Sequence, residues 1–188
     1  MLFERPGVQI TLILILLAAS FGVFQYVGAQ GEAVFKEFAD KEKLTSRFPE
    51  KAPFSYDEGR LQTLKSNYPA VARQYVSPIL FPFDLAFILI AGGSMLLASF
   101  YFTRMVGLPA HWVWLVLVLP VACVTVDLIE DSLLALMLKG TVGITAGSVL
   151  VLKALTVAKF ASFTGAILAT LVLTVWGLWT FARQAGAA

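Results

Sequence analysis

The stretch from His111 to Leu138 decides the fold, and it reads HWVWLVLVLPVACVTVDLIEDSLLALML. Residues 112–126 within it contain no charged residue. Three acids then follow within five positions: Asp127, Glu130 and Asp131. Because a helix needs ~20 mostly apolar residues to cross a lipid bilayer, the stretch predicts a membrane-spanning helix with acids toward one end.

The composition of the whole chain agrees with a membrane protein. Hydrophobic residues make up 59% of it, well above the roughly 45–50% of a soluble domain. The basic residues are not clustered and no groove-reading motif occurs, so we expect no nucleic acid partner. The single Cys123 cannot form an internal disulfide. The expected partners are the lipid bilayer and other membrane proteins or a second copy of this chain.

Four apolar runs predict an all-α membrane protein, an antiparallel bundle of four transmembrane helices. The first run gives an N-terminal signal-anchor span within residues 1–28; the small residues Val27, Gly28 and Ala29 leave a cleaved signal peptide as the alternative. The remaining segments are the second span at 81–104, the third span at 110–139, an interfacial helix at 140–158 and the fourth span at 159–183. Lys153 is the polar residue that suggests a position of this helix near the membrane interface.

Residues 29–80 differ from the rest, with eight Lys or Arg and seven Asp or Glu. Val34, Phe35 and Phe38 recur at helical spacing, which predicts an amphipathic helix over 31–47 lying on the membrane surface. Further along, Ser55 with Glu58 three residues later is typical of a capping box at a helix start. Pro69 favours the start of one more helix. The region therefore predicts a small helical subdomain without disulfides or strands.

Small residues and one proline predict local features of the spans. The run Gly92-Gly93-Ser94 allows close helix packing in lipid. Pro120 predicts a kink in the third span. Arg5, Arg104 and Arg183 flank the spans on one side, and positive charge marks the cytoplasmic side. We therefore expect both termini in the cytoplasm and residues 29–80 outside, in a bacterial inner membrane.

Acids and lysines of different spans are expected at one depth in the membrane. Asp127 lies ~24 Å along its helix, in the outer part of a ~30 Å hydrocarbon layer. A charge at the centre of a span costs ~3 kcal/mol, so we expect Asp127 and Glu130 to face the bundle interior near a lysine, Lys159 first and Lys153 second. The predicted polar cluster has six members: Asp84, Asp127, Glu130, Asp131, Lys153 and Lys159.

Three interpretations of this cluster remain open. It pairs helices structurally, or it forms a functional site for protons, cations or a cationic ligand, or its members are solvated helix ends. No nucleophile or third catalytic group accompanies the acids, so the sequence predicts no catalytic residues and no cofactor. A metal site would need oxygen ligands only, which suits Ca²⁺ or Mg²⁺, but the D-x-D-x-D-G spacing is missing and we predict no metal.

Short motifs spread over residues 55–138 form a pattern: Tyr56-Asp57 at a helix start, Tyr75, Asp84 ahead of the second span, Leu119-Pro120, and Asp127-Leu128-Ile129-Glu130-Asp131. In these motifs the chain resembles a group of uncharacterised four-span membrane proteins in bacteria, which have Asn where Asp131 stands here. The resemblance implies the four-span fold and carries no known activity. One span, a long outer loop and three more spans also resemble the claudin layout, but the Trp and paired Cys of the claudin loop are absent.

Two functions from different classes follow. The first is a non-enzymatic integral membrane protein that acts as a partner-binding, assembly or accessory subunit. The alternative is a proton- or cation-coupled transporter or channel component that uses the intramembrane carboxylates. Because four helices are few for a transporter, the alternative requires several copies to assemble.

Overall fold

The structure is a computed structural model that describes residues 6–42 and 57–185. Four long helices make up most of it: α1 (Pro6–Lys41), α4 (Leu85–Val106), α5 (Ala110–Lys139) and α6 (Ala146–Ala185). Each coincides in large part with a stretch long and apolar enough to cross a membrane. The described residues contain no strand. These features confirm the predicted all-α four-helix bundle and an integral membrane protein.

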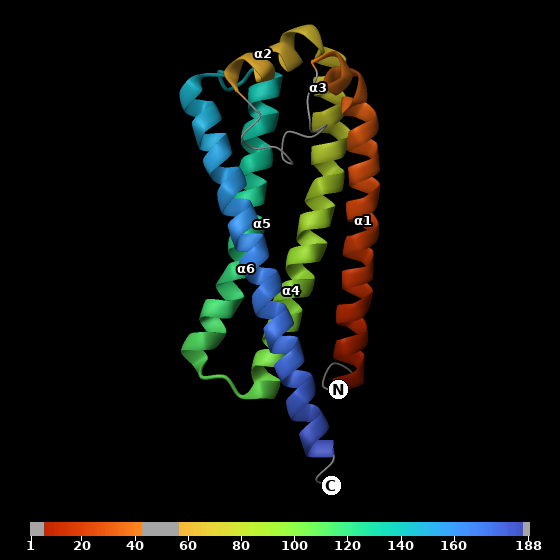
Figure 1. Cartoon of the computed structure of the whole chain (residues 1–188), viewed down its shortest axis with the longest axis vertical. Coiled ribbons are helices and arrows are strands. Elements are labelled where there is room, and N and C mark those ends of the chain that lie inside the picture. Colours follow the sequence, from red (N-terminus) through yellow and green to blue (C-terminus); the bar gives the residue numbers. More distant parts are fainter. Residues whose placement is uncertain (1–5, 43–56, 186–188) are drawn as a thin grey trace.

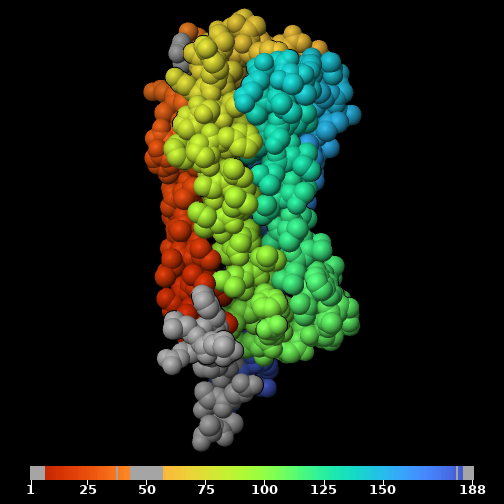
Figure 2. Space-filling model, turned by 180° about the vertical axis from the view of Figure 1, so that it is seen from behind, coloured from red at the N-terminus to blue at the C-terminus, as the bar shows by residue number. Residues whose placement is uncertain are grey.

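Long helices that follow one another along the chain run antiparallel (Figure 1). Both termini and the α4–α5 turn lie at one end of the bundle, and α2 (Glu58–Asn67), α3 (Pro69–Gln74) and the α5–α6 turn lie at the other. Helix α4 packs on α1, α5 and α6, whereas α1 and α6 hardly touch each other. Figure 2 shows the opposite face, where α1, α4 and α5 lie side by side.

The end opposite the termini holds the largest hydrophobic core of the molecule. We call it the apical core. It joins the last turns of α1 to α2, α3, α5 and the start of α6. Its largest members are buried: Phe35, Phe38, Leu61, Leu64, Tyr75, Leu80, Leu134 and Met137. Residues 29–80, which the sequence predicted as a small helical subdomain, contribute Phe35, Leu61 and Tyr75 to this core and share it with α5 and α6.

Helix α1 corrects the prediction of a separate amphipathic helix on the membrane surface. It continues without a break past Gly28 to Lys41, and residues 43–47 of the predicted helix lie outside the described residues. Phe35 and Phe38 are fully buried in the apical core, and the Phe35 ring meets the Tyr75 ring edge-on with centroids 4.6 Å apart. The apolar face that suggested contact with the membrane surface therefore packs against protein. This packing fixes the direction of the last turns of α1.

The capping box was placed two residues too early. Helix α2 begins at Glu58, and its N-cap is Asp57, whose Oδ1 accepts a hydrogen bond of 2.8 Å from the Arg60 backbone N–H. Ser55 lies outside the described residues. A carboxylate accepts a hydrogen bond from a free N–H of the first turn as well as a hydroxyl does. Asp57, directly before the helix, therefore serves as the N-cap in place of Ser55. Pro69 lies at the first position of α3, as predicted.

Segment η2 (Tyr75–Asp84) joins α3 to α4 and carries Asp84 at its end. Ser77 and Phe81 have extended backbone in it, and each precedes a proline with a cis peptide bond. A residue before proline is driven out of the helical region because the proline ring meets its backbone. The regular helix of the second span therefore begins at Leu85, within the predicted 81–104 span.

The α6 helix overturns the prediction of an interfacial segment at 140–158 followed by a separate fourth span at 159–183. Residues 146–185 form one helix, which begins at a capping box: the Thr145 N–H donates to Ser148 Oγ, 2.9 Å, and the Ser148 N–H donates to Thr145 Oγ1, 3.2 Å. Val149, Leu152 and Thr156 are buried on the same helix face. Lys153, the residue that suggested an interface, is half-buried within this continuous helix.

The third span and its contact with the second agree with the sequence. Helix α5 covers residues 110–139 and ends at Gly140, whose φ of 85° is the left-handed conformation that glycine favours. Gly92 lies where α4 comes closest to α5, since an added Cβ would collide with Val124. At Gly93, next to it, an added Cβ would meet no atom within 4 Å. Only the first of the two glycines is therefore required for close packing.

Candidate functional site

The acids of α5 point into the bundle. Asp127, Glu130 and Asp131 recur at helical spacing and share one face. Their exposed fractions are 1%, 2% and 1%. The sequence prediction that Asp127 and Glu130 avoid lipid is therefore confirmed. Asp84 reaches the same place from the end of η2, and we call these four residues the acid cluster.

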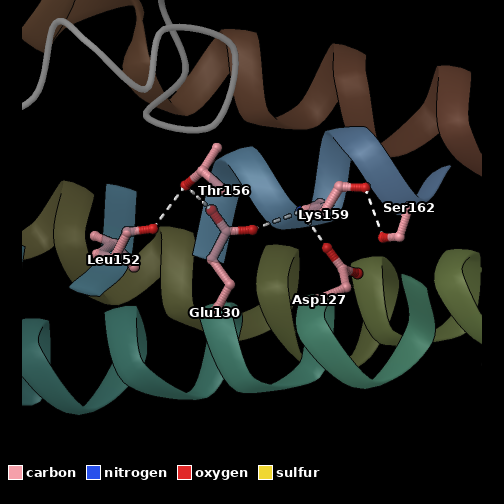
Figure 3. A network of polar contacts seen from close by, with 6 residues as sticks. All are labelled: Asp127, Glu130, Leu152, Thr156, Lys159 and Ser162. Atoms are coloured by element: carbon pink, nitrogen blue, oxygen red, sulfur yellow. Dashed lines mark hydrogen bonds and ion pairs between the residues drawn. The ribbon is translucent and has the colours of Figure 1, made fainter. Parts of the chain in front are cut away.

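Lys159 of α6 neutralises part of this charge. Its ammonium forms ion pairs with Asp127 and with Glu130, the second at 3.1 Å between Nζ and Oε2. Figure 3 shows the lysine between the two acids. The lysine side chain is 16% exposed, so this double ion pair lies almost wholly inside the protein. The prediction of Lys159 as the first partner is confirmed.

Thr156 is a member of the site that sequence reasoning missed. Its hydroxyl donates to Glu130 Oε1 and also lies 3.0 Å from the carbonyl oxygen of Leu152 (Figure 3). Thr156 precedes Lys159 by three residues and therefore shares its helix face. That spacing was the signal available in the sequence, but it is visible only once α6 is taken as one helix through both positions.

Lys153 was predicted as the second basic partner, and the structure does not place it there. It is half-buried on α6. Among the described residues, Lys159 is the lysine that forms ion pairs with the acid cluster. Lys153 precedes Thr156 by three residues and lies one turn nearer the apical core.

The remaining acids converge on one another. One carboxylate oxygen from each of Asp84, Asp127 and Asp131 lies within 4.8 Å of the other two. These oxygens come from two different segments, η2 and α5. Together with Glu130, the site brings four acids to a single lysine, so full ionisation would leave an excess of negative charge. Inside a membrane such an excess is costly, so protons or a cation must offset it.

The acid cluster lies toward one side of the membrane. At ~1.5 Å per residue, Asp127 is ~20 Å from Trp114 along α5, and Lys159 is ~26 Å from Trp176 along α6. Tryptophans mark the membrane–water interface, so these two place the interface at the end that carries the termini. In a hydrocarbon layer of ~30 Å the acid cluster therefore lies in the leaflet next to the apical core.

The chemistry of the site is that of hard oxygen ligands and exchangeable protons. Three carboxylates at these separations can share protons or surround a cation such as Mg²⁺, Ca²⁺ or an alkali ion. The chain matches no known protein-family model, no curated protein and no solved structure. The functional interpretation therefore rests on the geometry of the acid cluster itself.

Proposed function

We propose that this integral membrane protein binds protons or a small cation at the acid cluster, as a proton- or cation-coupled component of a transport or sensing system. The observation that carries the proposal is the convergence of Asp84, Asp127 and Asp131, whose carboxylate oxygens lie within 4.8 Å of one another. Lys159 already pairs with Asp127 and Glu130. Helix pairing alone needs one acid for one lysine, and the surplus of acids favours an exchangeable positive charge.

The test is ion flux through the full chain in liposomes that contain a pH-sensitive dye, with Na⁺, K⁺ or Mg²⁺ supplied outside. We expect wild-type protein to carry or exchange protons with at least one of these cations. Asp127→Asn and Glu130→Gln should abolish the signal. Asp40→Asn is the matched control, because Asp40 is an exposed acid beyond the acid cluster on α1. Flux that is absent, or insensitive to both cluster variants, would remove the proposal.

A role as a non-enzymatic partner-binding or accessory subunit is the second candidate, and the outward face of α1 favours it. Ala18, Gly22, Gln25 and Ala29 are exposed there at spacings of three and four residues. Small residues let a second helix approach closely in lipid, and an amide can form a hydrogen bond across such a contact. We propose that this face receives a helix of another membrane protein or of a second copy.

Disulfide trapping tests the accessory role. With Cys123 replaced by alanine, Gly22→Cys should form cross-linked species in membranes. Ala154→Cys, an exposed site on α6, should not. Gln25→Leu should weaken the association measured by light scattering in nanodiscs. A monomer without partners in all of these measurements would rule out this candidate.

For orientation, we propose that the end carrying both termini faces the cytoplasm of a bacterial inner membrane. The arginines at that end support this, since Arg104 and Arg183 lie beside the α4–α5 turn and the C-terminus. In a Cys123→Ala background, Ser66→Cys should react with an impermeant maleimide from the periplasmic side and Ala182→Cys should not. The reverse pattern would invert the topology.

A further inference from the structure

A cavity of about 210 Å³ lies beside the acid cluster, between all four long helices. Asp84 of the acid cluster and Lys159 are among its lining residues. The rest of its wall is mostly apolar, and four phenylalanines from three helices contribute to it: Phe24, Phe87, Phe160 and Phe163. The cavity is therefore lined mainly by aromatic and other apolar side chains, with one carboxylate in its wall.

The cavity opens toward lipid. Phe24 of α1 and Phe160 of α6 are each 45% exposed, and the helices that carry them hardly touch each other. On the side of the apical core, Leu80 and Leu134 are buried one turn beyond the acids of their own segments. A ligand that reaches Asp84 therefore enters sideways, between α1 and α6, from the hydrocarbon layer.

The charges around the cavity favour a cation over an anion. Among the described residues that line it, Lys159 is the one basic residue, and its ammonium is held by Asp127 and Glu130. Asp84 faces the cavity directly, with Asp131 close behind it. The lining residues from α1 carry no charge. Aromatic faces attract an ammonium group through their quadrupole, most strongly where water is excluded.

The volume limits the size of the ligand. An apolar cavity of ~150 Å³ accommodates a benzene molecule. The present cavity, about 210 Å³, is larger by roughly two to three methyl groups. It therefore fits a ring or short alkyl chain that bears a small ammonium group, and it is too small for a whole phospholipid.

We propose that this cavity binds a small lipophilic organic cation, an aromatic or alkyl ammonium that enters from the membrane and pairs with Asp84. The inference rests on the proposed function in one respect, since the acid cluster must be able to hold an exchangeable positive charge. The organic cation then competes with the proton or inorganic cation for the same carboxylates. Lipophilic organic cations are thus the proposed substrate class of the site.

The test uses benzylammonium as the probe and the full chain in nanodiscs, with binding followed by saturation-transfer NMR and calorimetry. Benzenesulfonate and benzyl alcohol are the anionic and neutral comparison ligands. We expect the ammonium to bind and the other two to bind at least about tenfold more weakly. Asp84→Asn should weaken ammonium binding by a similar factor, and Phe24→Leu by about twofold to tenfold.

Two glycines of α1 supply a variant that blocks the cavity without disturbing the fold. Gly28 lines the cavity and Gly7 is exposed near the start of α1, and an added Cβ would meet no atom within 4 Å at either position. Gly28→Leu should fill the cavity and abolish ammonium binding. Gly7→Leu should leave it unchanged. Equal binding by both variants would overturn the proposal, even if Asp84→Asn fails to fold.

The outcomes separate this inference from the proposed function. If Na⁺, K⁺, Mg²⁺ or protons act at the acid cluster but the ammonium does not bind, the organic-cation site is wrong and the proposed function stands. If neither inorganic nor organic cation acts there, both fail. Preferential binding of benzenesulfonate would identify an anion site at Lys159 and would also overturn the inference.

Discussion

Lys159 on α6 lies 3.1 Å from Glu130 on α5, and the same ammonium also pairs with Asp127. One cation therefore links two acids that lie one turn apart on a neighbouring helix. Losing a single acid still leaves the lysine with a partner, whereas losing the lysine leaves two buried acids without their cation. We therefore expect substitution of Lys159 to lower stability more than substitution of either acid.

Lys159→Met should lower stability by about 3–5 kcal/mol, the usual effect of removing one partner of a buried pair. Asp127→Asn alone should be milder, because Glu130 still holds the lysine. The triple variant Lys159→Met, Asp127→Asn, Glu130→Gln should recover much of the loss. Unfolding by denaturant in mixed micelles provides the measurement. Equal losses for Lys159→Met and Asp127→Asn would contradict the double ion pair.

Thr156→Val removes the hydroxyl that donates to Glu130 and keeps the shape of the side chain. We expect a loss of about 1–3 kcal/mol, the usual effect of leaving a buried polar group without its hydrogen bond. Thr156→Ser retains the hydroxyl and serves as the control. Thermal unfolding in detergent should rank wild type and serine together, above valine. A valine variant as stable as wild type would show that the hydroxyl contributes nothing.

Gly92→Ala and Gly93→Ala form a matched pair on α4. A Cβ at Gly92 collides with Val124 of α5, and a Cβ at Gly93 meets no atom within 4 Å. The first change should destabilise the bundle by about 1–3 kcal/mol, as overpacking does. The second should be neutral, or stabilise by up to ~1 kcal/mol because alanine favours the helix. Similar melting temperatures for the two variants would argue against close α4–α5 contact.

Asp57→Ala should weaken the start of α2 by about 1 kcal/mol, because the Arg60 N–H loses its acceptor. Asp57→Asn keeps an oxygen in place and should behave like wild type. Hydrogen exchange of the first turn of α2 is the direct measurement, with faster exchange expected in the alanine variant alone. Identical exchange in all three proteins would mean that another residue caps the helix.

Much of the fold could be predicted from the sequence because apolar length is a strong signal in membrane proteins. Helix α5 has no charged residue from 112 to 126, an apolar run after its acids and glycines beyond both ends, so its extent was clear. Helix α6 was divided wrongly because Lys153, Thr156 and Lys159 interrupt its apolar run. The orientation of Thr156 and Lys159 toward the acid cluster depends on tertiary packing, which hydropathy along the chain does not record.

The candidate site was predicted in part for the same reason. The cost of charge in lipid forces acids inward, so the burial of Asp127 and Glu130 followed from their place in a span. The choice of Lys159 over Lys153 depends on the rotation of α6, and one residue turns a helix by ~100°. The cavity could not be predicted, because it arises where α1 and α6 diverge around α4.

The length of α6 has a mechanical consequence. The helix contains 40 residues and no proline, and Lys159 fastens it to α5 at a point closer to its first residue than to its last. At ~1.5 Å per residue, ~20 Å of helix lies before the lysine and ~39 Å lies after it. The ion pair thus divides α6 into two unequal arms, and a tilt about this point would move the C-terminal tip about twice as far as the other.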